Sequence, residues 1–301
     1  MRSFHGNAGF FAILTFVLNQ LRYCEKHRYF PVVYLGEKIE GTGDFNAFYD
    51  AKAGDNVWEY YFEPVLEPGY SEILKMVEDP AHPLFEQELL SLSNKHLWYL
   101  HQHDSKSIYA YNYGYYKRKE KYDAGWYAEN RNRAHRLLEK YVQVKQPILK
   151  EIEDYYEEHM RGKNVIGVHM RGTDKGSAHA TEKTMRIVTP EEYVPHIDAY
   201  LKEHSGSMVF LATDQQQFLV DLKKRYGDQL LSYDAVRSDG NLAPFQMKDG
   251  KNFKKGKDVL IDCLLLSRCQ FLLKCTSHVG EAVLWFRPDL SHRDLNHDSP
   301  C

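Results

Sequence analysis

The stretch Asn164–Gly176, NVIGVHMRGTDKG, decides the fold. Its first seven residues form a short apolar run with β-branched members, which is typical of a buried strand in a parallel sheet. A base, a cation, an acid and a second cation lie within the seven residues 169–175, from the end of this run onward: His169, Arg171, Asp174 and Lys175. Because ligands bind at the carboxyl ends of strands in open parallel sheets, the stretch predicts a strand that delivers polar groups to a binding crevice.

The rest of the C-terminal half repeats this alternation of strand and helix. Strands are expected at MVFLATD (208–214), LLSYDA (230–235) and QFLLKC (270–275). Helices are expected at 189–204, 216–227, 257–269 and 276–286, the first of them opened by a threonine cap and a proline. The alternation predicts an α/β domain with a doubly wound parallel sheet over residues 161–301.

The N-terminal half, residues 1–160, is expected to be a second domain. A helix is predicted over 9–27 and a strand over 31–37, and helices divided by Pro147 are predicted over 129–161. Between 41 and 128 the sequence is irregular and rich in tyrosine. Aromatic rings with polar tips pack at the edge of a core and also stack on sugars, so both interpretations of this region stay open.

Composition excludes several classes of protein. The 301 residues are 43% hydrophobic and carry a formal net charge of -3, which gives no general attraction to nucleic acid or anionic lipid. Five cysteines without a C-x-x-C pair suggest neither a disulfide framework nor a zinc site. The run GFFAILTFVLNQL (9–21) is too short to span a bilayer, so a buried helix is favoured over a signal segment.

Compartment is not assigned by these patterns. No transmembrane segment is expected in the chain. The strand that should precede the His5–Gly9 loop has almost no room, which suggests a trimmed domain of a longer protein, and such a protein could be cytoplasmic or belong to the secretory pathway.

Polar residues after three expected strands should converge on one crevice. Arginine suits phosphate because its planar fork forms paired charge-assisted hydrogen bonds. Helix starts suit anions as well, through hydroxyls and backbone N–H groups. The structural alternatives are an ion pair between Arg171 and Asp174, and a core role for His169. The residues expected to converge are Arg171, Thr173, Asp174, Asp214, Thr276 and Ser277.

Several chemistries lack their motif in this sequence. There is no G-x-x-x-x-G-K-[ST] phosphate loop, no H-E-x-x-H, no G-x-S-x-G and no D-x-D of the kind that holds a divalent cation for sugar-nucleotide enzymes. The remaining hypothesis is a diphosphate site that uses neither a metal nor a cofactor.

In order and spacing, IGVHMRGTDK, TPEEYVPHID, VFLATD and VLIDCLLLSRCQFLLKCTSHVGEAV resemble the donor half of GDP-fucose-dependent fucosyltransferases. The branch of α1,6-fucosyltransferases and nodulation fucosyltransferases is the most similar. The resemblance is strong over residues 163–286, weaker at the N-terminus and not recognisable between 40 and 130. It implies two facing Rossmann-like domains, the arrangement called GT-B, and metal-independent transfer of fucose with inversion to a hydroxyl of a glycan.

The resemblance also implies roles for single residues. Arg171 matches the arginine that binds the diphosphate and stabilises the departing GDP, while His169 and Asp262 match contacts to the nucleotide at guanine. Asp214 and Ser277 match further donor positions, with Thr276 beside them. The loop Gly6, Asn7, Ala8 and Gly9 would approach the diphosphate from the opposite domain.

Two departures from the family leave alternatives open. Gly172 stands where a second arginine is common, so another nucleotide sugar or a catalytically inactive binding protein are competing hypotheses. The family's catalytic glutamate has no direct counterpart, and Glu182, His179 and Asp174 are the candidate bases. Candidates for acceptor binding are Trp58, Glu59, Tyr60, Glu63, Trp126 and Tyr127.

Overall fold

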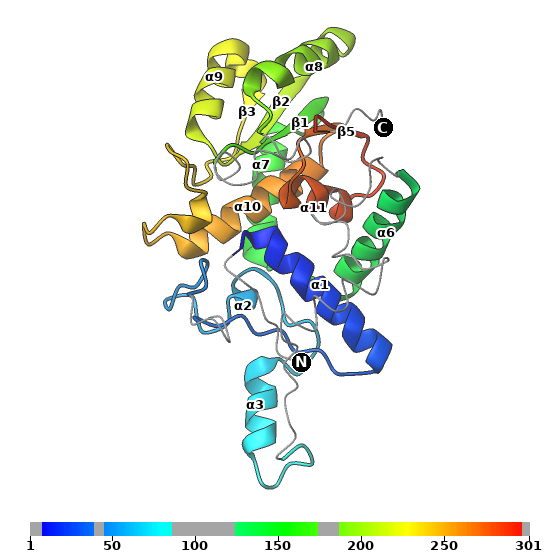
Figure 1. Cartoon of the computed structure of the whole chain (residues 1–301), viewed down its shortest axis with the longest axis vertical. Coiled ribbons are helices and arrows are strands. Elements are labelled where there is room, and N and C mark those ends of the chain that lie inside the picture. The colour runs from blue at the N-terminus through cyan, green and yellow to red at the C-terminus, as the bar shows by residue number, and fades with distance from the viewer. Residues whose placement is uncertain (1–7, 39–44, 86–123, 174–186, 297–301) are drawn as a thin grey trace. The chain divides into compact units, whose positions relative to one another are not determined.

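The computed structural model describes residues 8–38, 45–85, 124–173 and 187–296 (Figure 1). The chain divides into two compact units: unit 1 comprises 1–118 and 125–145, and unit 2 comprises 119–124 and 146–301. The main boundary therefore lies before helix α7 (Gln146–His159), which was expected in the N-terminal domain. The helix belongs to unit 2 because Ile148 and Ile152 are buried and it packs on α10 (Asn252–Ser267).

Unit 2 is built on a five-stranded parallel sheet with the order β3-β2-β1-β4-β5. A strand forms within each expected segment, although the one expected over 230–235 is limited to Leu230–Leu231, and a short edge strand that sequence patterns did not indicate completes the sheet. Their bounds are β1 Val165–Met170, β2 Met208–Thr213, β3 Leu230–Leu231, β4 Phe271–Lys274 and β5 His292–Asp294.

Helices cover both faces of this sheet (Figure 1). Alternate β1 side chains Ile166, Val168 and Met170 pack in one core with α8 (Pro190–Glu203) and α9 (Gln216–Tyr226). The opposite side of β1 meets α10, since a Cβ at Gly167 would lie 3.0 Å from atoms of Leu266 and Cys269. The remaining elements of unit 2 are α11 (His278–Phe286) and the 3₁₀ turns η4 (Gly227–Gln229) and η5 (Pro244–Gln246).

The strand order places a topological switch between β1 and β4. From β1 the chain adds β2 and then β3 on one side, and it then crosses to add β4 and β5 on the other. The connections therefore diverge above the carboxyl ends of β1 and β4, which is where such sheets bind ligands. This position holds Arg171 after β1 and the Thr276–Ser277 turn after β4.

The described part of unit 1 is helical, with isolated bridges in place of a sheet. Its helices are α1 (Phe10–His27), α2 (Trp58–Tyr61), α3 (Tyr70–Glu78) and α6 (Ala124–Tyr141). The strand expected over 31–37 is not formed, although the segment is extended and largely buried. The side-chain amide of Asn56 forms hydrogen bonds with the backbone of this segment: its oxygen accepts from the Leu35 N–H (3.0 Å), and its nitrogen donates to the Val33 carbonyl (3.0 Å).

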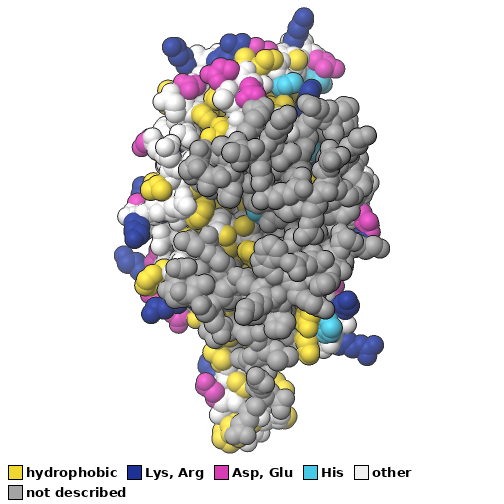
Figure 2. All heavy atoms as spheres, viewed as in Figure 1, with side chains coloured by type: hydrophobic (Ala, Val, Ile, Leu, Met, Phe, Trp, Pro, Cys, Tyr) yellow, Lys and Arg dark blue, Asp and Glu magenta, His cyan; other side chains and the backbone are white. Residues whose placement is uncertain are grey.

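The described aromatic residues of unit 1 mainly pack inside it. Trp58, Tyr60, Tyr61 and Tyr127 are all buried. On the surface, acidic and basic side chains are interspersed over the end of unit 2 that carries α8 and α9, which agrees with the small net charge (Figure 2). Within the described ranges, no helix has the length and apolar character needed to cross a membrane.

Candidate active site

The loop after β1 is organised by Asp214 at the end of β2. One carboxylate oxygen accepts from the Gly172 N–H (2.8 Å), and the other accepts from the Thr173 hydroxyl (2.7 Å). The same oxygen pairs with Nε of Arg171 at 3.1 Å, and both side chains are largely buried. A guanidinium has five N–H donors in a rigid fork, so an ion pair through Nε fixes the orientation of the fork. Asp214 thus holds Arg171 at the switch point.

Gly172 has no room for a side chain. A Cβ there would lie 2.4 Å from Oε1 of Gln215 and 2.9 Å from the ring of Phe218 on α9. The amide end of Gln215 could move, but the ring of Phe218 is packed against the core formed by β1, β2, α8 and α9. Gln215 and Phe218 therefore fill the space that a side chain at position 172, such as a second arginine, would need.

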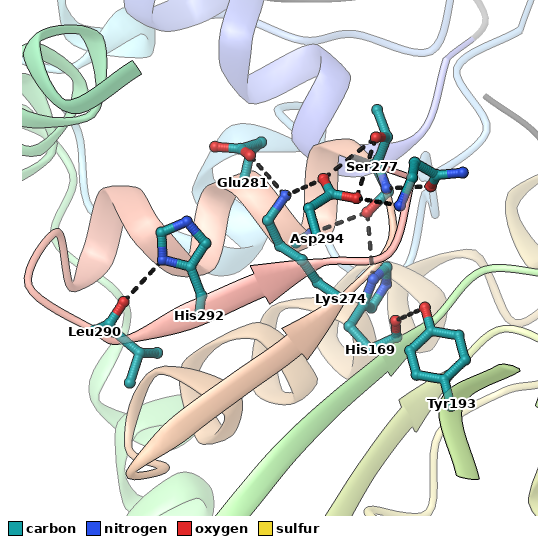
Figure 3. A network of polar contacts seen from close by, with 11 residues as sticks. His169, Tyr193, Lys274, Ser277, Glu281, Leu290, His292 and Asp294 are labelled. Atoms are coloured by element: carbon teal, nitrogen blue, oxygen red, sulfur yellow. Dashed lines mark hydrogen bonds and ion pairs between the residues drawn. The ribbon is translucent and has the colours of Figure 1, made fainter. Parts of the chain in front are cut away.

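The carboxyl end of β4 brings His169 and Ser277 together (Figure 3). Ser277 is the N-cap of α11, and its Oγ accepts from the Gly280 N–H at 3.0 Å. Nδ1 of His169 lies 3.3 Å from the same Oγ, while the His169 carbonyl accepts from the Tyr193 hydroxyl (2.9 Å). His169 is 4% exposed, so its ring lies beneath the start of α11 rather than on the surface.

Thr276 differs from the sequence expectation. Its hydroxyl and its N–H were expected to face an anion. Instead, the hydroxyl donates to Asp294 (3.2 Å to Oδ2), and the N–H donates to Oδ1 of Asn296 (2.7 Å). The difference follows from β5, which sequence patterns did not reveal: it supplies Asp294, and Asn296 lies just after its end. Thr276 therefore shapes the turn, and Ser277 is the capping residue.

A buried ion cluster underlies this turn (Figure 3). Nζ of Lys274 lies 2.7 Å from Glu281 Oε1 and 2.7 Å from Asp294 Oδ2, and the lysine is fully buried. The three residues come from β4, α11 and β5, so a single ammonium joins the elements that flank the switch point.

A second polar cluster consists of Asp258 and Asp262 on α10 together with Arg237, which precedes that helix in the chain. Asp262 is 6% exposed, and its Oδ1 has no hydrogen-bond partner among the described residues. Burial raises the pKa of this carboxyl to about 8; Arg237 opposes the rise, Asp258 adds to it, and Lys254 opposes it. Nε of Arg237 and Oδ1 of Asp258 are also buried without a partner in the described part of the chain. Buried polar atoms of this kind usually have a partner, so the cluster is a candidate ligand contact.

The acceptor candidates divide by burial. Trp58 Nε1 donates to the Glu63 carbonyl (3.0 Å) and the Tyr60 hydroxyl to the Gly54 carbonyl, so these rings serve packing and do not present a sugar-binding surface. Tyr127 is likewise buried. The carboxylates of Glu59 and Glu63 are partly exposed and contact Asn56 and Lys145.

Some predicted residues lie outside the described ranges. These are Gly6, Asn7, Asp174, Lys175, His179 and Glu182, together with the side chain of Trp126. Of the N-terminal loop, Ala8 and Gly9 are described, and Gly9 is the N-cap of α1, where its carbonyl accepts from Ala12 and Ile13.

A doubly wound sheet with polar residues at its switch point is a common nucleotide-binding arrangement, and comparison with known proteins narrows the class. Residues 134–279 match the family described as alpha-(1,6)-fucosyltransferase N- and catalytic domains. This match confirms the resemblance seen in the sequence. Residues 134–279 are thus similar to a fucosyltransferase catalytic domain, and this similarity supports a glycosyltransferase. No curated protein sequence matches the chain at a significant level.

Solved structures show the same fold. The chain is similar to NodZ alpha-1,6-fucosyltransferase soaked with GDP-fucose, with 17% identity, a TM-score of 0.57, and coverage of 95% of this chain and 92% of that one. Fucosyltransferase NodZ from Bradyrhizobium is 16% identical, with a TM-score of 0.54 and coverage of 94% of this chain and 91% of that one. POFUT1 in complex with GDP-fucose is 10% identical, with a TM-score of 0.52 and coverage of 99% of this chain and 95% of that one. The fold is that of the GT-B fucosyltransferases.

Sequence reasoning missed five residues of these clusters: Arg237, Asp258, Lys274, Glu281 and Asp294. A lysine inside the apolar run QFLLKC and an aspartate one helical turn before Asp262 were the available signals. A charge within a buried element must be paired or placed for function, which would have singled out both.

Proposed function

We propose that the protein transfers fucose from GDP-fucose to a hydroxyl of a glycan, with inversion of the anomeric centre and without a metal or other cofactor. The observation that carries the proposal is Asp262, a buried carboxylate with an unpartnered oxygen on a helix of the donor half. An ionised carboxylate is an acceptor only. Guanine offers two adjacent donors, N1–H and the exocyclic amine, whereas adenine and the pyrimidines lack that pair on one edge.

The switch point supplies the second requirement, which is stabilisation of the leaving group. As the bond between the anomeric carbon and the β-phosphate oxygen breaks, the sugar gains positive charge and GDP gains negative charge. A guanidinium oriented by Asp214 and the positive end of α11 are suited to that growing charge. Arg171 is accordingly the residue proposed to lower the barrier.

The acceptor hydroxyl then attacks from the face opposite GDP and gives its proton to a general base. Glu182, His179 and Asp174 stay the candidates for this base by residue type. Glu59 and Glu63 are the described carboxylates proposed to contact the glycan, because their side chains are partly exposed in unit 1.

The test begins with calorimetry of GDP, UDP, ADP and CDP against the intact protein and Asp262→Asn. We expect GDP to bind at least tenfold more tightly than the other nucleotides, and Asp262→Asn to remove that preference. Absence of a preference for GDP in the intact protein would overturn the proposal.

Turnover is tested with GDP-fucose on a glycan array, with and without a metal chelator. Fucosylated product that is unaffected by the chelator, and lost in Arg171→Ala, is the expected result. A protein that binds GDP but releases no fucose, with or without acceptors, would instead be the nucleotide-binding homologue that Gly172 suggests.

A further inference from the structure

Lys274, Glu281 and Asp294 form a buried cluster of charges, although an apolar residue in place of the lysine could fill the same space. The lysine is fully buried, and its ammonium contacts two carboxylates that are 4% and 7% exposed as residues. Removing three charges from water is expensive, and an apolar residue at the end of β4 would avoid that cost. The formal charge of the group is one positive against two negative, which leaves -1 beside a helix start.

The two carboxylates lie on opposite sides of the connection between β4 and α11: Asp294 contacts its first part, and Glu281 belongs to the start of α11. Asp294 accepts from the Thr276 hydroxyl, and its Oδ1 accepts from the Asn296 N–H (2.9 Å), while Asn296 holds the Thr276 N–H. Glu281 lies in the first turn of α11, directly after Gly280, whose N–H is held by Ser277. The packing is close, because a Cβ at Gly280 would lie 3.1 Å from Cδ of Lys274. Lys274 therefore contacts both partners that fix the turn.

The charges of the Lys274 cluster also affect the electrostatic potential at the start of α11. Two carboxylates behind a helix start would repel an anion and oppose the positive end of the helix. A buried ammonium between them offsets one of the two charges at short range, where water screens little. The cluster thus determines both the shape of the Thr276–Ser277 turn and the potential in front of it.

We propose that Lys274 is a positioning residue of the donor site: by joining Glu281 and Asp294 it holds the turn at residues 275–277 and keeps its surroundings receptive to the diphosphate of the donor. This inference rests on the proposed function. It concerns the phosphate groups, not the base, which Asp262 is proposed to bind.

The test separates phosphate from base by measuring the affinities for GDP and for guanosine with the full-length protein at pH 8. Lys274→Met is compared with Lys255→Met, another buried lysine, which pairs with Asp249 (2.6 Å) on a different part of unit 2. Lys274→Met is expected to lower the ratio of GDP affinity to guanosine affinity at least tenfold. Lys255→Met should leave this ratio unchanged, even where it lowers the melting temperature.

Glu281→Gln keeps the ammonium and its contact with Asp294 but removes one negative charge. It is expected to raise the ratio about threefold, since one negative charge fewer behind the turn lessens the repulsion of the diphosphate through a partly screened medium. A cluster that acts only by shaping the turn predicts a lowered ratio in both variants, because each of them weakens the contacts of the ammonium.

The outcomes are distinct. Equal losses for GDP and guanosine in Lys274→Met, or a ratio that is unchanged or lowered in Glu281→Gln, would overturn the inference. If Lys274→Met does not fold, the Glu281→Gln result decides by itself. If the intact protein binds neither ligand, the proposed function fails, and this inference fails with it; intact GDP binding with an unaltered ratio in the variants refutes the inference only.

Discussion

Replacing Asp262 by asparagine should stabilise the ligand-free protein while weakening its proposed function. Burial raises the pKa of this carboxyl from an ordinary 3.8 to about 8, so the folded state holds the proton more tightly than the unfolded chain does. The resulting stability is fully present below pH 3.8 and is lost as the pH rises towards 8. Each pH unit in this window corresponds to about 1.4 kcal/mol.

At pH 7 the loss therefore amounts to about 4 kcal/mol, a large fraction of the 5–15 kcal/mol that is typical of folded proteins. Asparagine cannot ionise and avoids this loss. We expect Asp262→Asn to raise the Tm of the ligand-free protein by roughly 8 °C at pH 7 and to flatten its dependence on pH between 5 and 8.

Differential scanning calorimetry of the ligand-free protein across that pH range checks this expectation. Asp249→Asn is the control in the same unit: burial acts to raise the pKa of Asp249, but the hydrogen bond and ion pair with Lys255 (2.6 Å) outweigh it and lower that pKa. The control should lose stability. A Tm for Asp262→Asn at or below that of the unaltered protein at pH 7, or equal pH slopes in the two proteins, would refute the reasoning.

Three further outcomes follow from the same contacts. GDP affinity should rise as the pH increases towards 8, by up to about tenfold per unit, because binding requires ionised Asp262; calorimetry in buffers of different ionisation enthalpy should detect the released proton. Arg171→Ala should lower turnover of GDP-fucose by about 10²- to 10³-fold, measured as product formed at saturating donor. Gly172→Ala should lower the free energy of unfolding by about 1–3 kcal/mol in chemical denaturation, through overlap with Phe218, and unchanged stability would contradict the packing described.

Sequence patterns were sufficient for β1, β2 and β4 because these strands are largely buried and apolar and each is followed by a helix. Thr189 and Glu192 illustrate a helix start signal, since the Thr189 N–H bonds the Glu192 carboxylate at 3.0 Å. The convergence of Arg171 with Asp214, and of His169 with Ser277, follows from strand order, which the alternation of elements nearly determines.

The failures have physical causes of the same local kind. Residues 31–37 carry the pattern of a strand, yet Asn56, 21 residues after Leu35, and the Val57 N–H bond its backbone in place of a strand neighbour, and no periodicity encodes that exchange. Trp58 and Tyr60 are amphipathic, so composition cannot distinguish packing from sugar stacking until burial is known. Thr276 was assigned to the ligand because β5, only three residues long, is too short to produce a pattern.

The tight packing around Gly172 constrains the evolutionary history of this site. An arginine cannot be gained at position 172 by one tolerated mutation, because Gln215 and Phe218 occupy its volume. A smaller residue would first have to arise at one or both positions, without yet conferring any benefit. With Gln215 and Phe218 in place, further contacts to a donor are accordingly expected from other positions around the loop.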